Sequence, residues 1–248
     1  MKLFLLIVAA MIGGAANALA GGGQFIVFPA LLFAGVASVK ANATASLAMV
    51  PGGIASAWVY RRSFLDKPQR EVSHLIVMSI IGSLAGSILL LSTPNATFSA
   101  LVPWLLLIAA SVFTAAPHLR RAAAKASGSK SMFWLLLGQF IIALYGGYFG
   151  AGMGVLMIAL FLAAANMDVQ SGNGVRLLCG TAINLLAVVV FAIHGAIDWK
   201  VGVPMVFAGI TGGYLSARGM RRLSEKAARH AILVYAWGLT AWFFLHAG

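Results

Sequence analysis

The sequence GGGQFIVFPALLF at residues 21–33 interrupts the apolar beginning of the chain, and the similar sequence GAGMGVLMIALFL at residues 150–162 interrupts its second half. In each half the glycine-rich segment borders a short apolar run, at 24–37 and 151–166, below the roughly 20 residues of a membrane-spanning helix. Membrane helices tolerate such breaks because neighbouring helices satisfy the freed backbone groups. The two stretches therefore predict a bundle of membrane helices in which two are short and broken.

The composition around these breaks is that of an integral membrane protein. Of 248 residues, 61% are hydrophobic and only 9% are charged, against roughly 25% charged in an ordinary soluble domain. The apolar runs are continuous rather than alternating, which disfavours a β-barrel. They lie at 3–20, 24–37, 41–60, 72–92, 98–117, 131–149, 151–166, 175–194, 201–217 and 230–247. We expect an all-α integral membrane protein.

The first run also has the form of a secretory signal peptide, because Lys2 precedes an apolar stretch that ends in Ala18-Leu19-Ala20. The alternative is a retained first helix. A counterpart of this run in the second half favours retention, since a removed leader would need none. Whether residues 1–20 are kept stays open at this point.

The positive charges are concentrated in three short stretches. The chain has 17 Lys and Arg against five Asp and Glu, a formal net charge of +12. Thirteen of these cations are Arg61, Arg62, Lys67 and Arg70; Arg120, Arg121, Lys125 and Lys130; and Arg218, Arg221, Arg222, Lys226 and Arg229. By the positive-inside rule we expect these stretches to be cytoplasmic loops. The charge is thereby explained without a nucleic-acid partner.

Comparison of the chain with itself at an offset of 131 residues indicates an internal duplication. Gly21–Gly23 then lies over Gly152–Gly154, and Asn42 lies over Asn173. With one residue inserted, Asp66 matches Asp198, and the glycine pair Gly82/Gly86 resembles Gly209/Gly213 and suggests helix packing. We expect a first transmembrane repeat at 1–117, a basic cytoplasmic linker at 118–130 and a second repeat at 131–248.

The charges also distinguish two topologies. If both short runs cross the membrane, each repeat has five spans and all three basic stretches face the cytoplasm. If both are re-entrant, each repeat has four spans and the stretch at 218–229 faces the opposite side. The positive-inside rule favours five and five spans, inverted relative to each other, with both termini outside. Inverted repeats with broken helices are the architecture of many secondary transporters, whose binding sites lie where the repeats meet.

The glycine breaks themselves are candidates for a binding site. Gly22 and Gly23, with Gly152 and Gly154 in the second half, can expose backbone N–H groups, and each following helix adds the positive end of its dipole. Together they would make a cradle for an anion that needs no cation. The alternative is that these glycines allow close helix packing or a kink.

Polar residues beside the breaks extend the candidate site. Asn42 and Thr44, with Asn173 and Arg176 in the second half, supply hydrogen-bond donors where a third span begins. Helix capping and interhelical contacts are the alternative for the asparagines. Arg176 suits an oxyanion in bidentate fashion, or else anchors a cytoplasmic helix end. Three further buried polar candidates, for which a structural role is the favoured alternative, are Gln24, Asn17 and Asn184, of which Gln24 joins the candidate site.

Chemistry beyond binding has few candidates. His194 and Asp198 are four residues apart, and they would form a weak proton-coupling pair if the helix continues through Gly195. No zinc-protease helix, Walker loop or nucleophile elbow is present, and the single cysteine, Cys179, excludes an internal disulfide or a cysteine metal cluster. We expect no enzyme, no cofactor and no metal.

With these residues in view, the chain resembles the sulfite exporter TauE/SafE family of membrane transporters. The similarity rests on Gly21-Gly22-Gly23, Phe28-Pro29-Ala30-Leu31-Leu32 and Ala41-Asn42-Ala43-Thr44, then on GGYFGAGMG at 146–154, Asn173 and the stretch from Phe191 to Trp199. The sequence departs from the family pattern at Met153, where a third glycine is frequent, and at Leu160, where the first half has Pro29. The resemblance covers essentially the whole chain. It implies an inner-membrane transporter, often associated with export of sulfite or organosulfonates and driven by an ion gradient.

The residues and the resemblance agree on a secondary transporter of a small anion that works by alternating access. Its expected partners are the anionic substrate and the lipid bilayer, with a homodimer as a candidate assembly. The alternatives are a non-transporting assembly or sensor subunit, an intramembrane enzyme, and a carrier of another small substrate such as a carboxylate.

Overall fold

The computed structural model describes residues 2–20, 22–125, 131–165, 167–218 and 225–246, and within these ranges the chain is helical without strands. The helices are α1 (Lys2–Ala20), α2 (Gln24–Phe33), α3 (Ser38–Val59), α4 (Arg62–Leu65), α5 (Gln69–Ser92), α6 (Asn95–Lys125), α7 (Met132–Tyr148), α8 (Met153–Ala164), α9 (Val169–Ile193), α10 (Trp199–Arg218) and α11 (Glu225–His246). The all-α prediction is confirmed for the described residues.

The outside of this bundle is apolar. Among the described helices, three are long and apolar enough to cross a membrane: α5, α6 over Asn95–Ala123, and α9. Large apolar side chains point outward along the bundle, including Phe4 and Trp58, each 68% exposed, and Ile193, 76% exposed. Apolar exposure on this scale is unfavourable in water and favourable in lipid. The fold is therefore consistent with an α-helical membrane protein.

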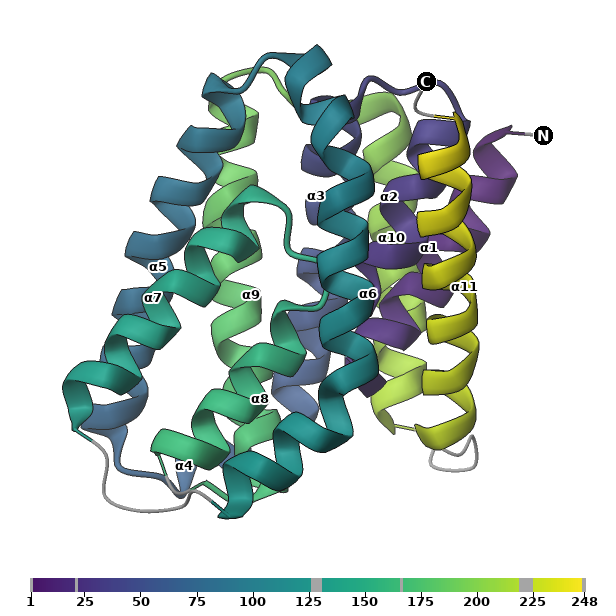
Figure 1. Cartoon of the computed structure of the whole chain (residues 1–248). Helices are drawn as coiled ribbons and strands as arrows, with labels where there is room; N and C mark the ends of the chain where they lie inside the picture. Colours follow the sequence, from purple (N-terminus) through teal and green to yellow (C-terminus); the bar gives the residue numbers. More distant parts are fainter. Residues whose placement is uncertain (1, 21, 126–130, 166, 219–224, 247–248) are drawn as a thin grey trace.

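The basic stretches follow helices that all end at the same end of the molecule. In Figure 1, α3, α6 and α10 all end at the end of the molecule where α4 lies, whereas α1 begins and α11 ends at the opposite end. The three basic stretches therefore start from one end, although residues 219–224 of the third lie outside the described residues. The linker predicted at 118–130 begins inside α6, which continues to Lys125. The alanine-rich sequence there has high helix propensity, and this outweighs the preceding Pro117.

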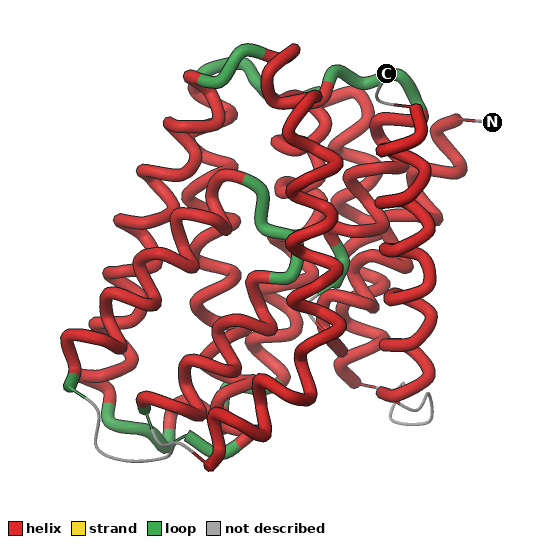
Figure 2. The backbone as a smooth tube through the Cα atoms, in the orientation of Figure 1, coloured by secondary structure: helices red, strands yellow, loops and turns green. Residues whose placement is uncertain are grey.

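The two short helices begin inside the molecule. Figure 2 shows the loops before α2 and α8 at mid-height of the bundle. Ten and twelve residues give these helices lengths of about 15 and 18 Å, against a hydrocarbon core of about 30 Å. Lys2 Nζ donates to Ala34 O at 3.3 Å, so α2 returns to the end where α1 begins. Each short helix therefore has the length to reach only about half-way through a membrane. From the sequence we expected both short runs to cross it fully.

Helices from the two halves of the sequence pack directly on each other through glycines. α5 lies against α7, and α10 lies against α1 and α3. A Cβ at Gly82 would lie 2.5 Å from Phe140 O of α7, and one at Gly52 would lie 2.7 Å from Gly209 O of α10. Backbones approach this closely only where side chains are absent. The interpretation of the glycine pairs at 82/86 and 209/213 as helix-packing surfaces is confirmed.

Substitution of Gly86 tests this packing. A Cβ at Gly86 would collide with the carbonyl group of Leu144 and lie 2.9 Å from Tyr148 N. We expect Gly86→Ala to destabilise the protein by about 1–3 kcal/mol, the usual cost of overpacking. Thermal unfolding of the purified protein in detergent measures it.

Gly238→Ala is the matched control for this prediction. A Cβ at Gly238 meets nothing within 4 Å, and alanine favours a helix over glycine by about 1 kcal/mol. The control should be neutral or stabilising. Equal melting temperatures for the two variants would contradict the packing described here.

Candidate substrate-binding site

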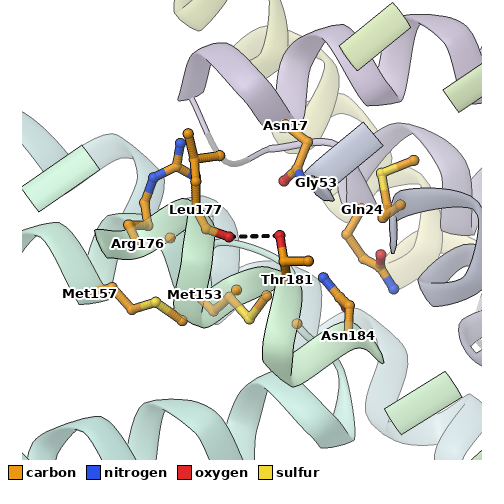
Figure 3. Close-up of a pocket in the computed structure, with 13 residues that line it drawn as sticks. Asn17, Gln24, Gly53, Met153, Met157, Arg176, Leu177, Thr181 and Asn184 are labelled. Atoms are coloured by element: carbon orange, nitrogen blue, oxygen red, sulfur yellow. Dashed lines mark hydrogen bonds between the residues drawn. The ribbon is translucent and has the colours of Figure 1, made fainter. Parts of the chain in front are cut away.

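A small cavity lies beside the second glycine break, where α8 and the start of α2 meet α1, α3 and α9. Its volume is about 30 Å³, room for about one or two water molecules. Figure 3 shows residues of α9 on one side of this space and Asn17 and Gln24 on the other. It is lined by Asn17, Gln24, Met49, Gly53, Gly150, Met153, Gly154, Met157, Arg176, Leu177, Gly180, Thr181 and Asn184.

The cavity wall carries a buried positive charge. Arg176 is only 4% exposed, and its Nε and Nη2 donate to Asn173 Oδ1 at 3.0 and 2.8 Å. Nη2 also donates to Ala18 O at 3.5 Å. These two acceptors are neutral oxygens, and they help to hold the guanidinium in place at the cavity wall. Arg176 and Asn173 were both predicted site residues. Arg176 lines the cavity, and Asn173 holds the Arg176 guanidinium in position.

Side-chain amides supply further polar groups. Gln24, Asn17 and Asn184 all line the cavity. Within the described part of the chain, the side chains of Asn17 and Asn184 make no hydrogen bond to other protein groups, whereas Gln24 Nε2 donates to Asn42 Oδ1 at 3.1 Å. From the sequence we favoured a structural role for Asn17 and Asn184. No hydrogen-bond partner among the described residues supports that role. Their donors and acceptors are available to a ligand.

Asn42 joins the two glycine breaks instead of lining the cavity. It is 1% exposed, it accepts from Gln24 at the start of α2, and its Nδ2 donates to Tyr148 O at 3.0 Å. Tyr148 is the last residue of α7, immediately before the second break. One asparagine thereby satisfies polar groups from both halves, as interrupted helices in a membrane require.

The four predicted glycines have different surroundings. Gly154 lines the cavity, and Gly152 has a positive φ of 77° that starts α8, a conformation that favours glycine. Gly22 and Gly23 are buried in packing contacts: a Cβ would lie 3.1 Å from Ile232 at the first and 2.8 Å from Met49 Sδ at the second. The packing alternative thus describes the first break, and the cavity lies nearer the second.

Thr44, His194 and Asp198 lie away from this cavity. Thr44 Oγ1 accepts from Asp198 N at 3.0 Å, a contact between α3 and the start of α10. α9 ends at Ile193, and Gly195 turns the chain with a φ of 65°, so the continuous helix assumed for a His194–Asp198 pair is not present. His194 Nδ1 contacts Val190 O at 2.8 Å, and Asp198 Oδ1 accepts from Val201 N at 3.4 Å. Proton coupling by these two residues stays a prediction.

Asp168 begins α9 at the end of the molecule where α4 lies. It accepts hydrogen bonds from Ser171 Oγ at 2.6 Å and Ser171 N at 2.9 Å, and Lys67 Nζ lies 3.4 Å from its Oδ2. The bonds from Ser171, then Lys67, lower the pKa of Asp168 below its ordinary value. Asp168 is therefore an ionised helix cap at neutral pH.

Several lining residues were not predicted. Among them are Met49 and Gly180, which are 131 residues apart, and Gly53, which is 131 residues before the predicted candidate Asn184; all four line the cavity. The repeat offset was thus a signal that could have found them. Thr181 had no comparable signal, and Met153, noted only as a departure from the family glycine, is part of the wall.

The fold and the cavity define a class of protein: a helical membrane protein whose interrupted helices surround a polar space in its interior. The particular family follows from comparison with known proteins. The family model described as Sulfite exporter TauE/SafE matches residues 6–242, so the chain belongs to this family. The family and its named relatives are membrane transporters, not enzymes.

Three relatives illustrate the match. A "Probable membrane transporter protein" of Haemophilus influenzae is 29% identical over 91% of this chain and 88% of its own length. The "Probable membrane transporter protein ORF9" of Sinorhizobium sp is 30% identical over 87% and 82%, and YfcA of Escherichia coli, with the same description, is 24% identical over 91% and 83%. No solved structure matches the chain significantly.

The hydrogen bonds of Asn42 predict an effect on stability. Asn42→Ala leaves Gln24 and the carbonyl of Tyr148 without their partner, which costs about 1–3 kcal/mol for buried groups. Asn184→Ala, a matched removal of an amide that has no partner within the described residues, should leave stability nearly unchanged. Unfolding followed by tryptophan fluorescence compares them, and an equal loss in both variants would contradict the bridging role of Asn42.

Proposed function

We propose that this protein is a secondary transporter that carries a small anion, such as sulfite or an organosulfonate, across the inner membrane. It spans that membrane several times, and its two inverted repeats give alternating access to the central cavity. The observation that carries the proposal is Arg176: a buried guanidinium, fixed by Asn173 and Ala18, on the wall of a cavity that both short helices line.

The chemistry of the cavity supports an anion. A cation inside a membrane protein is costly, and such residues generally mark substrate or ion pathways. A guanidinium with amide donors beside it matches an oxyanion, which accepts charge-assisted hydrogen bonds through several oxygens. Asn17 and Asn184 supply these amide donors from α1 and α9. The cavity therefore differs from the cation-free cradle expected from the glycines.

The order and direction of the helices support inverted repeats. α1, α2, α3, α5 and α6 are followed by α7, α8, α9, α10 and α11 in the same sequence of long and short helices. α1 and α7 begin at opposite ends of the molecule (Figure 1). The contacts between helices correspond as well, because α5 packs on α7 as α10 packs on α1, and α6 packs on α8 as α11 packs on α2. Opposed repeats around one site are the arrangement that alternating access uses.

The size of the cavity implies movement. At about 30 Å³ the cavity leaves little free space beside its polar groups, so we expect its walls to separate when the anion enters. The walls belong to both halves, with Gln24 and Met49 on one and Met153 and Arg176 on the other. We therefore expect the anion to enter a wider conformation, and we expect closure to bring the two halves back to the arrangement described here.

Transport into proteoliposomes tests the proposal. Sulfite, sulfate, thiosulfate, sulfoacetate, taurine and small carboxylates are offered to the purified protein in turn. We expect saturable transport of one anion class, and we expect Arg176→Gln to lower kcat/KM by about 10- to 100-fold, because a hydrogen bond to a charged group contributes about 1.5–3 kcal/mol. Arg176→Lys should keep part of the activity, since it retains the charge and loses the planar donors.

Arg70→Gln is the matched control, because Arg70 is exposed at the end of the molecule where α4 lies. It should transport as the parent protein does. Transport of no anion by a folded parent protein would favour the assembly or sensor subunit instead. Transport of a carboxylate alone would change the substrate class, and full activity of Arg176→Gln would remove the central cavity as the site.

A further inference from the structure

A second, larger cavity lies at the end of the molecule opposite to the basic stretches. Its volume is about 590 Å³, and it lies between the starts of α1, α3 and α10 and the loop after α2. Three lysines line it: Lys2, Lys40 and Lys200. Outside the three basic stretches the sequence contains only these lysines and Arg176 as cations. Every cation outside the basic stretches therefore lies on one of two cavities.

The charges of this cavity do not balance. Asp198 is the one acidic residue among the lining residues, so the formal charge is three positive less one negative, or +2. Within the described part of the chain, Asp198 makes no ion pair, and its Oδ1 accepts from Val201 N. The ammonium groups of Lys40 and Lys200 make no hydrogen bond or ion pair there either. Their charge is thus directed to whatever enters the cavity.

A cavity at the other end of the molecule provides a comparison. It has a volume of about 350 Å³ and contains Arg62 and Lys67 with Asp66 and Asp168. Its two positive and two negative charges balance, and Lys67 forms an ion pair with Asp168 at 3.4 Å. The end of the molecule that is richest in cations therefore has a neutral cavity, while the end with few cations has the positive cavity. The positive cavity therefore does not lie where the cations of the sequence are most numerous.

Two hydrogen bonds bring the lysines together. Thr44 Oγ1 accepts from Asp198 N at 3.0 Å and donates to Lys40 O at 2.7 Å, so it fixes the start of α3 beside the start of α10. Lys40 lies one turn before Thr44, and Lys200 follows Asp198 by two residues. Lys2 Nζ donates to Ala34 O at 3.3 Å, which places the third lysine on the loop after α2.

The loop itself offers little to an anion. The backbone N–H groups of Gly35 and Val36 already donate to carbonyl oxygens of α2, to Leu32 at 2.9 Å and Leu31 at 3.1 Å. These two N–H groups are thus occupied, whereas the ammonium groups of Lys40 and Lys200 make no hydrogen bond within the described residues. An ammonium group is a mobile point charge with three donors, suited to oxyanions without demanding one shape.

We propose that Lys2, Lys40 and Lys200 form a second oxyanion site, separate from the central cavity, at the end of the molecule where α1 begins. It takes a sulfate, sulfonate or phosphate group, either from a free anion or from a lipid headgroup. Thr44 is a positioning residue of this site, which gives a role to a polar residue that does not line the central cavity. The site does not depend on the proposed transport function.

Binding of radiolabelled sulfate tests this site. The full-length protein is placed in phosphatidylcholine nanodiscs at low ionic strength, and the triple variant with Lys2→Gln, Lys40→Gln and Lys200→Gln is compared with the parent. We expect sulfate affinity to fall on the order of tenfold, because each exposed cation contributes modestly and the three act together. Sulfate held at Arg176 is common to both proteins and does not affect the difference. Added NaCl should weaken only the lysine-dependent binding.

Two control variants separate charge from folding. Replacing the same lysines with arginine should retain sulfate binding. Arg62 and Lys67 lie in the neutral cavity, and replacing both with glutamine should leave sulfate binding unchanged. If the triple variant does not give a monodisperse protein, Lys200→Gln alone carries the test, with an expected loss of about two- to fivefold.

Nanodiscs that contain phosphatidylglycerol distinguish the two sources of the oxyanion. Sulfate binding that is equal in both lipids indicates a free anion. A headgroup phosphate is indicated if sulfate binding is lost in phosphatidylglycerol nanodiscs and native mass spectrometry shows that retention of this lipid depends on the lysines. Either result supports the oxyanion site. The proposal is overturned if folded lysine-to-glutamine variants bind sulfate and retain phosphatidylglycerol as the parent does, whatever the transport assay shows.

Discussion

The hydrogen bonds of Asn42 are the contact on which the interior of this protein depends. Two helices are interrupted inside the membrane region, and the freed backbone and side-chain groups there need protein partners because lipid supplies none. Asn42 accepts from Gln24 at the first break and donates to Tyr148 O at the second. The breaks of the two halves are thereby joined, and the central cavity forms beside this connection. A polar residue that is costly alone becomes favourable because both breaks share it.

The sequence was sufficient to predict the membrane class and the positions of the interrupted helices, because continuous apolar runs and glycine clusters are strong signals. It could not predict the rotation of α9. Arg176, Gly180 and Asn184 recur at intervals of four on the face that lines the cavity, as one side of a helix does. In a membrane protein the opposite face is equally apolar, so hydropathy does not distinguish interior from lipid. The sequence could therefore indicate Asn184 as a buried polar candidate but could not place it on the cavity, and Thr181 required the three-dimensional arrangement.

Apolar patterning predicted that α2 and α8 are short, but it could not show that they begin in the interior of the molecule. A run of apolar residues has the same composition whether it crosses a membrane or stops at its centre. The difference lies in backbone geometry: Gly150 and Gly152 have positive φ and turn the chain in the interior, where α8 begins. The basic stretches still start from one end of the molecule, because a pair of antiparallel helices returns the chain to its starting end whatever its depth.

The distribution of positive charge connects the two cavities to one physical principle. A cation is least costly where water or an anion compensates it, and membrane insertion keeps most cations on the cytoplasmic side. The four cations outside the basic stretches lie on cavities rather than against lipid. Arg176 is held by Asn173 and Ala18, and the lysines are brought together by Thr44 and the loop after α2. Neutral oxygens thus help to hold positive charge at both cavities, which are the places where we propose that an anion binds.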